Sequence, residues 1–436
     1  MKSNIKILDC TLRDGGYYTN WDFDESTVDS YIEAMNNLPI DYIEIGYRSI
    51  KLEGYLGEYF YLPIQTIKKI RNKSSKKTVI ILNEKDIRVE HLEGVLGQCI
   101  GLIDLVRIAV DPKNIKRAIV LAKGLKKMNF EVGFNIMYMS TWFDEKDFFR
   151  SLPEVNNVAD FFYMVDSFGG VYPNDVIKTY QRIKKDLTIQ IGFHGHNNLE
   201  LALINTLTAI NCGVDIVDAT ITGMGRGAGN LKTELLLTHL SSTENIKINF
   251  NSLSSVVDVF SVLQEKYKWG TNLPYMVSGA NSLPQKQVME WVSNRFYSFN
   301  SIIRALNNRS QGVIDNERVE VFKINKNCDK ILIIGGGASV ENSFKFIESF
   351  LIKNSDTLII HSSSRNASLF SKLKNDQIFC LLGNEGYRME KVFENNLPIE
   401  SKCILPPYPR LMGTYIPIKM KDRSYELDKI VFKSID

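Results

Sequence analysis

Two short segments of the chain carry residue types that together could bind a divalent metal ion. Residues 9–17 have the sequence DCTLRDGGY and place Arg13 beside Asp14, directly after an apolar run. Residues 193–198 have the sequence FHGHNN, and because residues two apart in a strand face the same way, His194 and His196 would share one side. One carboxylate and two imidazoles form an open metal site that leaves positions for a substrate. A lone H-x-H pair is more often structural, but the two segments together favour a metal site.

Mixed carboxylate and imidazole ligands predict Mn²⁺ or Mg²⁺ and would also accept Zn²⁺. A 2-oxo acid could occupy the open positions with its carboxylate and keto oxygen, and the positive charge there would stabilise an enolate. Arg13 could donate a hydrogen bond to the same developing oxyanion. A further group must move the proton on the alcohol of the substrate or product, and the candidates are Tyr17, Tyr47 and Tyr275.

A glycine loop with the sequence GMGRGAGN, residues 223–230, could approach a substrate closely with its backbone. We expect Gly225 and Gly227 to contribute in this way. The helical pattern that follows, 231–240, would favour an anion such as a carboxylate at its N-terminus. Asn230 could bind the metal or serve as a helix N-cap, and the two roles are compatible.

Alternating strand and helix patterns must position these residues. Eight apolar segments predict strands at 5–10, 42–46, 78–82, 105–110, 131–137, 161–166, 188–194 and 216–221. Amphipathic helical patterns separate them, for example 114–128 and 199–212. This alternation predicts parallel βα units, and eight of them predict an α/β (β/α)8 TIM barrel, with a doubly wound open sheet as the alternative.

In such a barrel, side chains at the carboxyl ends of the strands form the active site. We expect substrate-binding residues there, namely Glu44, Asn135, Asp166 and Ser167. For Glu44, Arg107 and Asp218, a buried structural hydrogen bond is an equally good interpretation.

Two further regions follow the barrel. Helical patterns at 253–266, 285–292 and 301–307 predict a helical extension that packs on the barrel, forms a dimer contact, or acts as a lid that delivers Tyr275. A later module has strand patterns at 330–334, 357–361 and 377–382 and a helical pattern at 340–352. We therefore expect a barrel at 1–245, the extension at 246–325 and a small Rossmann-like α/β domain at 326–436.

Between the first strand and helix of this last domain lies the turn GGGAS. Such a turn can hold phosphate with backbone amides, so Gly335, Gly337 and Ser339 are candidate phosphate-binding residues. Val340 stands where a dinucleotide fingerprint has its third glycine, so a purely structural module remains equally open.

The composition argues against nucleic acids and membranes as partners. The net charge of +3 and the lack of a basic run with interleaved aromatics argue against nucleic acid. No stretch approaches the roughly 20 apolar residues that cross a bilayer. The N-terminus shows no secretory signal, and six scattered cysteines without a C-x-x-C predict reduced thiols of a cytoplasmic protein. We expect a small oxo acid as substrate and a homodimer as the assembly.

Three motifs in this order, TLRDG at 11–15, HGHNN at 194–198 and GMGRGAGN at 223–230, resemble those of the HMGL-like family of metal-dependent barrel lyases and synthases. The resemblance implies that Asp14, His194 and His196 bind the metal and that Arg13 stabilises the enolate. The HNNLELA run at 196–202 and the AGN of the loop are most similar to the 4-hydroxy-2-oxovalerate aldolases. The resemblance therefore implies a carbon–carbon lyase that cleaves or forms a 4-hydroxy-2-oxo acid through a pyruvate enolate.

The sequence departs from these relatives at one position that matters. The aldolases carry a catalytic histidine where this chain has Tyr17, and the synthases carry an acidic residue and glutamine where it has Gly16 and Tyr17. Arg226 is more similar to the synthases. A Claisen synthase that joins an acyl-CoA to a 2-oxo acid, and a barrel without catalytic activity, are the alternatives.

Overall fold

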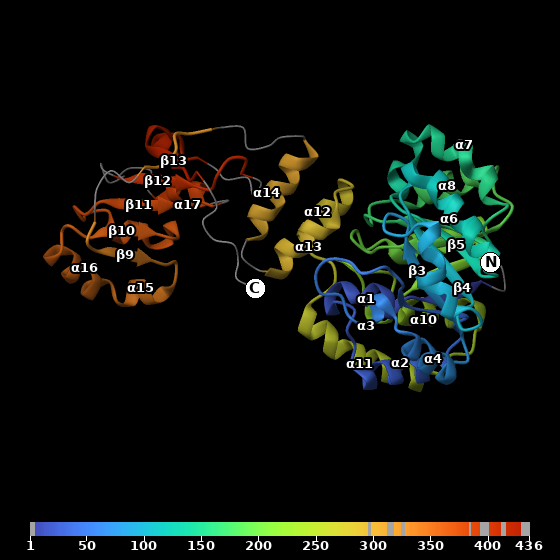
Figure 1. Ribbon diagram of the computed structural model, residues 1–436. Coiled ribbons are helices and arrows are strands. Elements are labelled where there is room, and N and C mark those ends of the chain that lie inside the picture. Colours follow the sequence, from blue (N-terminus) through green and yellow to red (C-terminus); the bar gives the residue numbers. More distant parts are fainter. Residues whose placement is uncertain are drawn as a thin grey trace. The chain divides into compact units, whose positions relative to one another are not determined.

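The computed structural model describes residues 5–294, 298–311, 318–323, 328–382, 385–392, 401–410 and 416–428. The chain divides into two compact units, Met1–Met289 and Glu290–Asp436 (Figure 1). The three-part division expected from the sequence stays a prediction.

The first unit is a closed barrel of eight parallel strands in sequence order. Strand β8 pairs with β1, with Leu8 opposite Asp218, and this pairing closes the sheet. The predicted TIM barrel is therefore confirmed, and an open sheet is excluded. The strands are β1 (Lys6–Asp9), β2 (Tyr42–Tyr47), β3 (Lys77–Asn83), β4 (Leu105–Val110), β5 (Glu131–Ile136), β6 (Phe161–Asp166), β7 (Gln190–Gly195) and β8 (Ile216–Ala219).

Helices surround the barrel because each parallel crossover returns the chain to the same end of the sheet (Figure 1). They are α1 (Thr11–Thr19), α2 (Glu25–Asn36), α3 (Glu58–Tyr61), α4 (Ile64–Lys73), α5 (Leu92–Leu96), α6 (Ile115–Lys127), α7 (Lys146–Val155), α8 (Pro173–Ile183), α9 (Ala202–Cys212), α10 (Thr233–Glu244) and α11 (Phe250–Tyr267). Helices α12 (Leu273–Ala280) and α13 (Gln285–Asn294) follow, and α13 crosses the boundary between the two units. Most apolar side chains pack between these helices and the strands.

The barrel interior changes from apolar to polar along the strands. Its apolar cluster includes Leu105 of β4 and Ile216 of β8. Two residues further on, and therefore on the same face, lie Arg107 and Asp218, both fully buried. The chemistry of this barrel is thus concentrated at the carboxyl ends of its strands.

The second unit contains α14 (Phe299–Ser310) and a parallel sheet with strand order β13-β12-β11-β10-β9. Its strands are β9 (Ile331–Ile334), β10 (Leu358–His361), β11 (Gln377–Cys380), β12 (Lys402–Leu405) and β13 (Ser424–Glu426), and its helices are α15 (Ala338–Asn342), α16 (Phe344–Lys353) and α17 (Glu385–Val392). The small α/β domain is confirmed. Its strand order, however, lacks the reversal that creates the nucleotide crevice of a Rossmann sheet. The helix expected at 340–352 is two helices, which meet at Ser343.

Among the described residues, no helix is long and apolar enough to span a membrane. No disulfide joins the cysteines of the described residues.

Candidate active site

Helix α1 carries Arg13 and Asp14 across the mouth of the barrel. It begins at Thr11, whose backbone N–H and hydroxyl both donate to Oδ1 of Asp9, at 2.9 and 2.6 Å. The chain therefore turns directly from β1 into a helix. Glycine is needed inside it, because a Cβ at Gly16 would overlap the indole ring of Trp21.

The four predicted metal-binding side chains, Asp14, His194, His196 and Asn230, lie next to one another at this mouth. Oδ2 of Asp14 lies 2.7 Å from Nδ2 of Asn230 and 3.6 Å from Nε2 of His194. The rings of His194 and His196 are 4.9 Å apart. Nδ1 of His196 is bound to the backbone oxygen of Asp166 at 2.8 Å, which leaves its Nε2 as the ligand atom. All four side chains are buried, and Oδ1 of Asn230 has no partner among the described residues.

The protonation states at this cluster suit a metal ion. Burial acts to raise the pKa of Asp14, but the Arg13 guanidinium and then the two histidines outweigh it and lower that pKa to about 2. Burial, followed by the charges of His194 and Arg226, lowers the pKa of His196 well below 6.5. An ionised carboxylate and a neutral imidazole are the forms that bind a cation.

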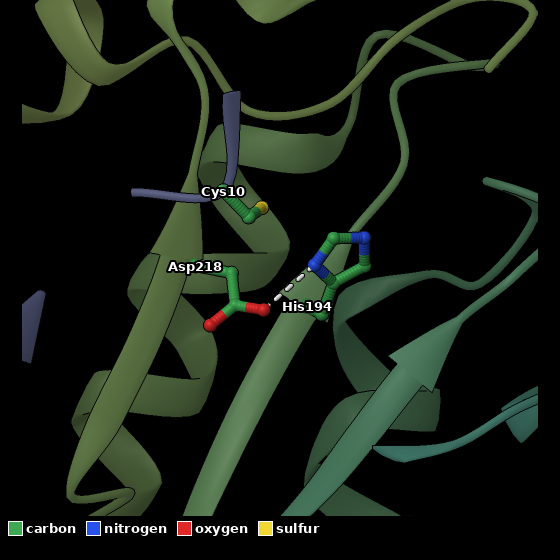
Figure 2. A group of neighbouring side chains, drawn as sticks. All are labelled: Cys10, His194 and Asp218. Atoms are coloured by element: carbon green, nitrogen blue, oxygen red, sulfur yellow. Dashed lines mark hydrogen bonds and ion pairs between the residues drawn. The ribbon is translucent and has the colours of Figure 1, made fainter. Parts of the chain in front are cut away.

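Asp218 and Arg107 lie behind His194. Oδ2 of Asp218 is 2.8 Å from Nδ1 of His194, and Nη1 of Arg107 donates to the same oxygen at 2.7 Å. Figure 2 shows that the second ring nitrogen of His194 points away from this carboxylate. Asp218 therefore fixes the orientation of the imidazole.

Cys10, His194 and Asp218 also place three potential ligand atoms within 4.8 Å of one another (Figure 2). Burial, reinforced by the charge of Asp14, raises the pKa of the Cys10 thiol well above 9.0. Since Oδ2 of Asp218 is already bound by Arg107 and His194, we assign this trio to the support of His194 rather than to a metal. The sequence interpretation missed Cys10, although its alternation with Leu8 in β1 could have placed it inside the barrel.

Glu44 links the two buried arginines. Its Oε2 accepts a hydrogen bond from Nε of Arg13 at 2.6 Å, and its Oε1 lies 3.0 Å from Nε of Arg107. The Arg107 guanidinium also lies over the ring of Tyr163, 4.5 Å from its centroid. For Glu44, Arg107 and Asp218, the structure thus shows the structural hydrogen-bond role that the sequence left open.

The remaining polar residues of the predicted substrate site differ in whether their side chains have a hydrogen-bonding atom left for a substrate. Asp166 accepts from the backbone N–H groups of Gly170 and Val171, and burial raises its pKa to about 6. The Ser167 hydroxyl accepts from the N–H of Tyr138 at 2.9 Å. Asn135 is buried, and its Oδ1 has no partner among the described residues. The Asn135 amide is therefore the one of these three groups with an unused buried acceptor.

The structure separates the tyrosines proposed for proton transfer. The hydroxyls of Tyr17 and Tyr47 are 3.2 Å apart. Tyr275, in α12, packs against the glycine loop beside Tyr18, whose hydroxyl donates to the Gly227 oxygen at 2.8 Å. Burial raises the pKa of Tyr275 to about 12, against the effect of a hydrogen bond with Tyr18.

The sequence interpretation also missed Asn198, which ties α12 to β7. Its Nδ2 donates to the backbone oxygen of Tyr275 and to Oε1 of Gln285, each at 2.9 Å. Helix α12 therefore packs on the barrel. Such packing is one of the three roles that the sequence predicts for the helical extension. The signal for Asn198 was its place in the same FHGHNN segment as the histidines.

Close packing explains the glycines of the loop. A Cβ on Gly225 would lie 2.6 Å from Nδ2 of Asn230, and Gly227 has a φ of +63°, which disfavours larger residues. Glycine at position 225 therefore leaves room for the Asn230 amide.

The candidate phosphate-binding residues Gly335, Gly337 and Ser339 lie in the second unit, around the turn from β9 to α15. Nδ2 of Asn366 donates to the oxygens of Gly335 and Gly337 at 3.0 and 3.1 Å. Helix α15 has only five residues, so its dipole is small. A phosphate-binding role for this turn stays a prediction.

A parallel (β/α)8 barrel with one carboxylate, two imidazoles and an arginine at its carboxyl-terminal mouth defines a class of metal-dependent lyases and synthases. A family model described as HMGL-like matches residues 104–260. The 4-hydroxy-2-oxovalerate aldolase of Geobacillus genomosp. 3 is 32% identical over 250 residues, which cover 55% of this chain and 71% of that relative. The oxaloacetate decarboxylase of Mycobacterium tuberculosis is 28% identical over 243 residues, covering 54% of this chain and 69% of that relative.

Solved structures give the same result. The N-terminal domain of a protein assigned as an aldolase from Bacteroides vulgatus is 57% identical, with a TM-score of 0.66, and covers 69% of this chain and 100% of that domain. The carboxyl transferase domain of Rhizobium etli pyruvate carboxylase is 14% identical, with a TM-score of 0.56 over 71% of this chain and 56% of that one, and shows the fold alone. The chain belongs to the HMGL-like family, and the expected class of enzyme, a carbon–carbon lyase, is confirmed.

Proposed function

We propose that this protein is a divalent-metal-dependent aldolase that cleaves or forms a 4-hydroxy-2-oxo acid through a pyruvate enolate. The observation that carries the proposal is that Asp14, held by Arg13, lies beside His194, whose ring lies next to that of His196. Relatives named 4-hydroxy-2-oxovalerate aldolase support the same substrate class.

The residues present fit a divalent cation. Asp14, His194, His196 and Asn230 would hold it, and the buried, unpartnered Oδ1 of Asn230 is the kind of atom that a cation would satisfy. Carboxylate, imidazole and amide donors suit Mn²⁺ or Mg²⁺. Bound there, the cation would supply positive charge that stabilises negative charge on the keto oxygen of a 2-oxo acid.

Arg13 supplies the second source of positive charge. Its Nη1 is bound to Asp14 and its Nε to Glu44, so the guanidinium is held rigidly beside the proposed ligands. Its Nη2 forms no hydrogen bond with a described residue and can donate to the enolate oxygen. A group already in position costs no reorganisation when the charge develops. Asn135, whose Oδ1 is unpaired, would accept a hydrogen bond from the substrate.

Proton transfer at the alcohol is proposed for Tyr17. Its hydroxyl lies 3.2 Å from that of Tyr47, and burial, with the neighbouring Tyr17 next in effect, raises the pKa of Tyr47 well above 10.0. Tyr47 therefore keeps its proton and can hydrogen-bond to Tyr17 as the latter gains or loses one. Tyr275 remains the second candidate, although its contacts are with the glycine loop.

Cleavage of 4-hydroxy-2-oxovalerate, followed as pyruvate with lactate dehydrogenase, tests the proposal. We expect metal-dependent pyruvate release by the wild type, with kcat reduced on the order of 100-fold in Arg13→Gln. Arg150→Gln, in an exposed ion pair on α7, is the matched control and should retain activity. Thiol release from acetyl-CoA with a 2-oxo acid, without aldol cleavage, would instead establish a Claisen synthase. Inactivity in both assays across a panel of 4-hydroxy-2-oxo acids would contradict catalysis of either kind.

Three finer expectations belong to the same proposal. These are Mn²⁺ or Mg²⁺ as the metal, a homodimer as the assembly, and the cytoplasm as the location.

A further inference from the structure

Arg226 differs from the other two arginines at the mouth of the barrel. Arg13 and Arg107 each have at least one carboxylate oxygen within 3.0 Å. Arg226 forms no ion pair with a carboxylate of the described residues. Its Nη2 donates to the backbone oxygen of Ser167 at 3.2 Å, and its Nε is buried without a partner. A buried nitrogen without a hydrogen-bond partner calls for an explanation, and a bound carboxylate or phosphate is one that suits a guanidinium.

Three contacts place this guanidinium next to the proposed catalytic groups. Its Cζ lies 5.7 Å from the ring centroid of Tyr17. Its charge acts on His196, where it is among the causes that lower the pKa of that imidazole. Its hydrogen-bond partner, Ser167, directly follows β6 at the same end of the barrel. Arg226 therefore lies on the side of the metal-binding cluster where Tyr17 is found.

The neighbouring acidic groups are already occupied. Asp166 directs its carboxylate to the N–H groups of Gly170 and Val171. Asp14 and Glu44 are bound by Arg13. None of these three carboxylates pairs with Arg226 in the described part of the chain, so an anionic group of the substrate would neutralise it.

We propose that Arg226 selects an acceptor aldehyde that carries an anionic group, either a carboxylate or a phosphate. This inference rests on the aldolase function proposed above and names its acceptor class. In the condensation, the acceptor carbonyl becomes the alcohol whose proton Tyr17 is proposed to transfer. The Arg226 guanidinium lies over the ring of Tyr17. The carboxylate of pyruvate would instead lie with its keto oxygen, beside Asp14 and Arg13. The pyruvate carboxylate and the anionic group of the aldehyde would thus meet different positive charges.

Aldol condensation of pyruvate with three aldehydes of similar length tests this assignment. The aldehydes are butanal, which is neutral, succinic semialdehyde, which carries a carboxylate, and glyceraldehyde 3-phosphate. We expect the wild type to prefer one of the two anionic aldehydes over butanal in kcat/KM, and the preferred one identifies the anion. In Arg226→Gln this preference should fall on the order of 100-fold, mainly through the KM of the aldehyde. Arg226→Lys, which keeps the charge, should recover part of the preference, whereas a purely structural role predicts no such rescue.

Exchange of the pyruvate methyl protons in D₂O, measured without any aldehyde, separates the possible failures. Arg226→Gln could raise the KM for pyruvate in the exchange reaction by the same factor by which it loses condensation activity. That result would assign Arg226 to pyruvate and overturn the inference. Equal losses for butanal and the anionic aldehydes would also overturn it, as would a wild type that prefers butanal. If the wild type exchanges the pyruvate methyl protons but shows no preference for the anionic aldehydes, only the proposed role of Arg226 is contradicted. Absence of exchange in the wild type contradicts the proposed function and, with it, this inference.

Discussion

Nδ1 of His194 lies 2.8 Å from Oδ2 of Asp218, and this contact decides which nitrogen of the ring faces the active site. Because Nδ1 faces this carboxylate, Nε2 is the ring nitrogen on the side of Asp14, 3.6 Å from its Oδ2. Arg107 keeps Asp218 ionised: burial opposes ionisation, but the guanidinium and His194 outweigh it and lower the pKa of Asp218 below 3.8. The buried series Arg107, Asp218 and His194 thus orients one of the proposed metal ligands.

Replacing Asp218 with asparagine tests this arrangement. The amide oxygen could still accept from both His194 and Arg107, but the side chain would no longer carry the negative charge that holds these two groups. We expect the affinity for Mn²⁺ to fall by about 10- to 100-fold, as is usual when the partner of a metal-binding histidine is lost. Isothermal titration calorimetry measures the change, with circular dichroism to confirm folding. Unchanged affinity in a folded variant would mean that Asp218 does not orient His194.

Gly225→Ala should damage the same centre without changing any polar group. The added methyl group would lie 2.6 Å from Nδ2 of Asn230 and displace the amide from Asp14. We expect kcat/KM for aldol cleavage to fall at least about 10-fold, since small misplacements at a reacting centre are costly. Gly94→Ala is the matched control, because a Cβ there meets nothing within 4 Å. Equal activity of the two variants would argue against a role for the Asn230 position.

Glu44→Gln should destabilise the barrel. Glu44 is fully buried between Arg13 and Arg107, and its loss leaves these guanidinium groups with one carboxylate fewer. Removing one member of a buried ion pair costs about 3 kcal/mol or more. Urea denaturation measures the free energy of unfolding. Glu25→Gln, which breaks an exposed ion pair with Lys69, should cost less than about 1 kcal/mol. Similar costs for the two variants would contradict this account of the buried cluster.

The stability of the second unit should depend on pH through His361. Burial lowers the pKa of His361 from 6.5 to about 4, although its hydrogen bond to Gln377 acts in the opposite direction. Between pH 6.5 and 4 the unfolded chain therefore binds a proton that the folded one does not. Stability should be greatest above pH 6.5 and fall by at most about 3 kcal/mol as the pH drops to 4.

Proton NMR of the five histidines in the full-length protein checks this prediction. Free imidazole in the same sample serves as the reference for titration, and His361→Gln assigns the signal. The His361 signal should not shift between pH 7.5 and 5.0. A midpoint close to that of the reference would show that the ring is accessible to water and would contradict the expected loss of stability.

The fold could be predicted because each strand and helix of the barrel has a recognisable local pattern. Strands β4 and β6 match the expected bounds, since apolar runs of this length between helical patterns have few other interpretations. Strands β12 and β13 were missed because four and three residues with mixed polarity give no periodic signal.

The features of the site that could not be predicted are contacts between residues far apart in the sequence. Arg107 and Asp218 are 111 positions apart, and only closure of the barrel brings them together. The pairing of Tyr17 with Tyr47 and the placement of Tyr275 against Gly227 likewise depend on side-chain directions that no spacing encodes. Alternation within each strand could have shown that Cys10 and Asp218 point inward, but not which partners they meet.

Proton exchange at the methyl group of pyruvate in D₂O tests the central claim most directly, because it requires only the metal-binding cluster and Arg13. Purified protein with Mg²⁺ or Mn²⁺ would be incubated with pyruvate, the metal removed, and the loss of the methyl signal followed by NMR. The account predicts exchange that stops with a chelator and falls on the order of 100-fold in His194→Ala, with the control Arg150→Gln active. Exchange that persists in metal-free His194→Ala, or its absence in the wild type with either metal, would contradict it.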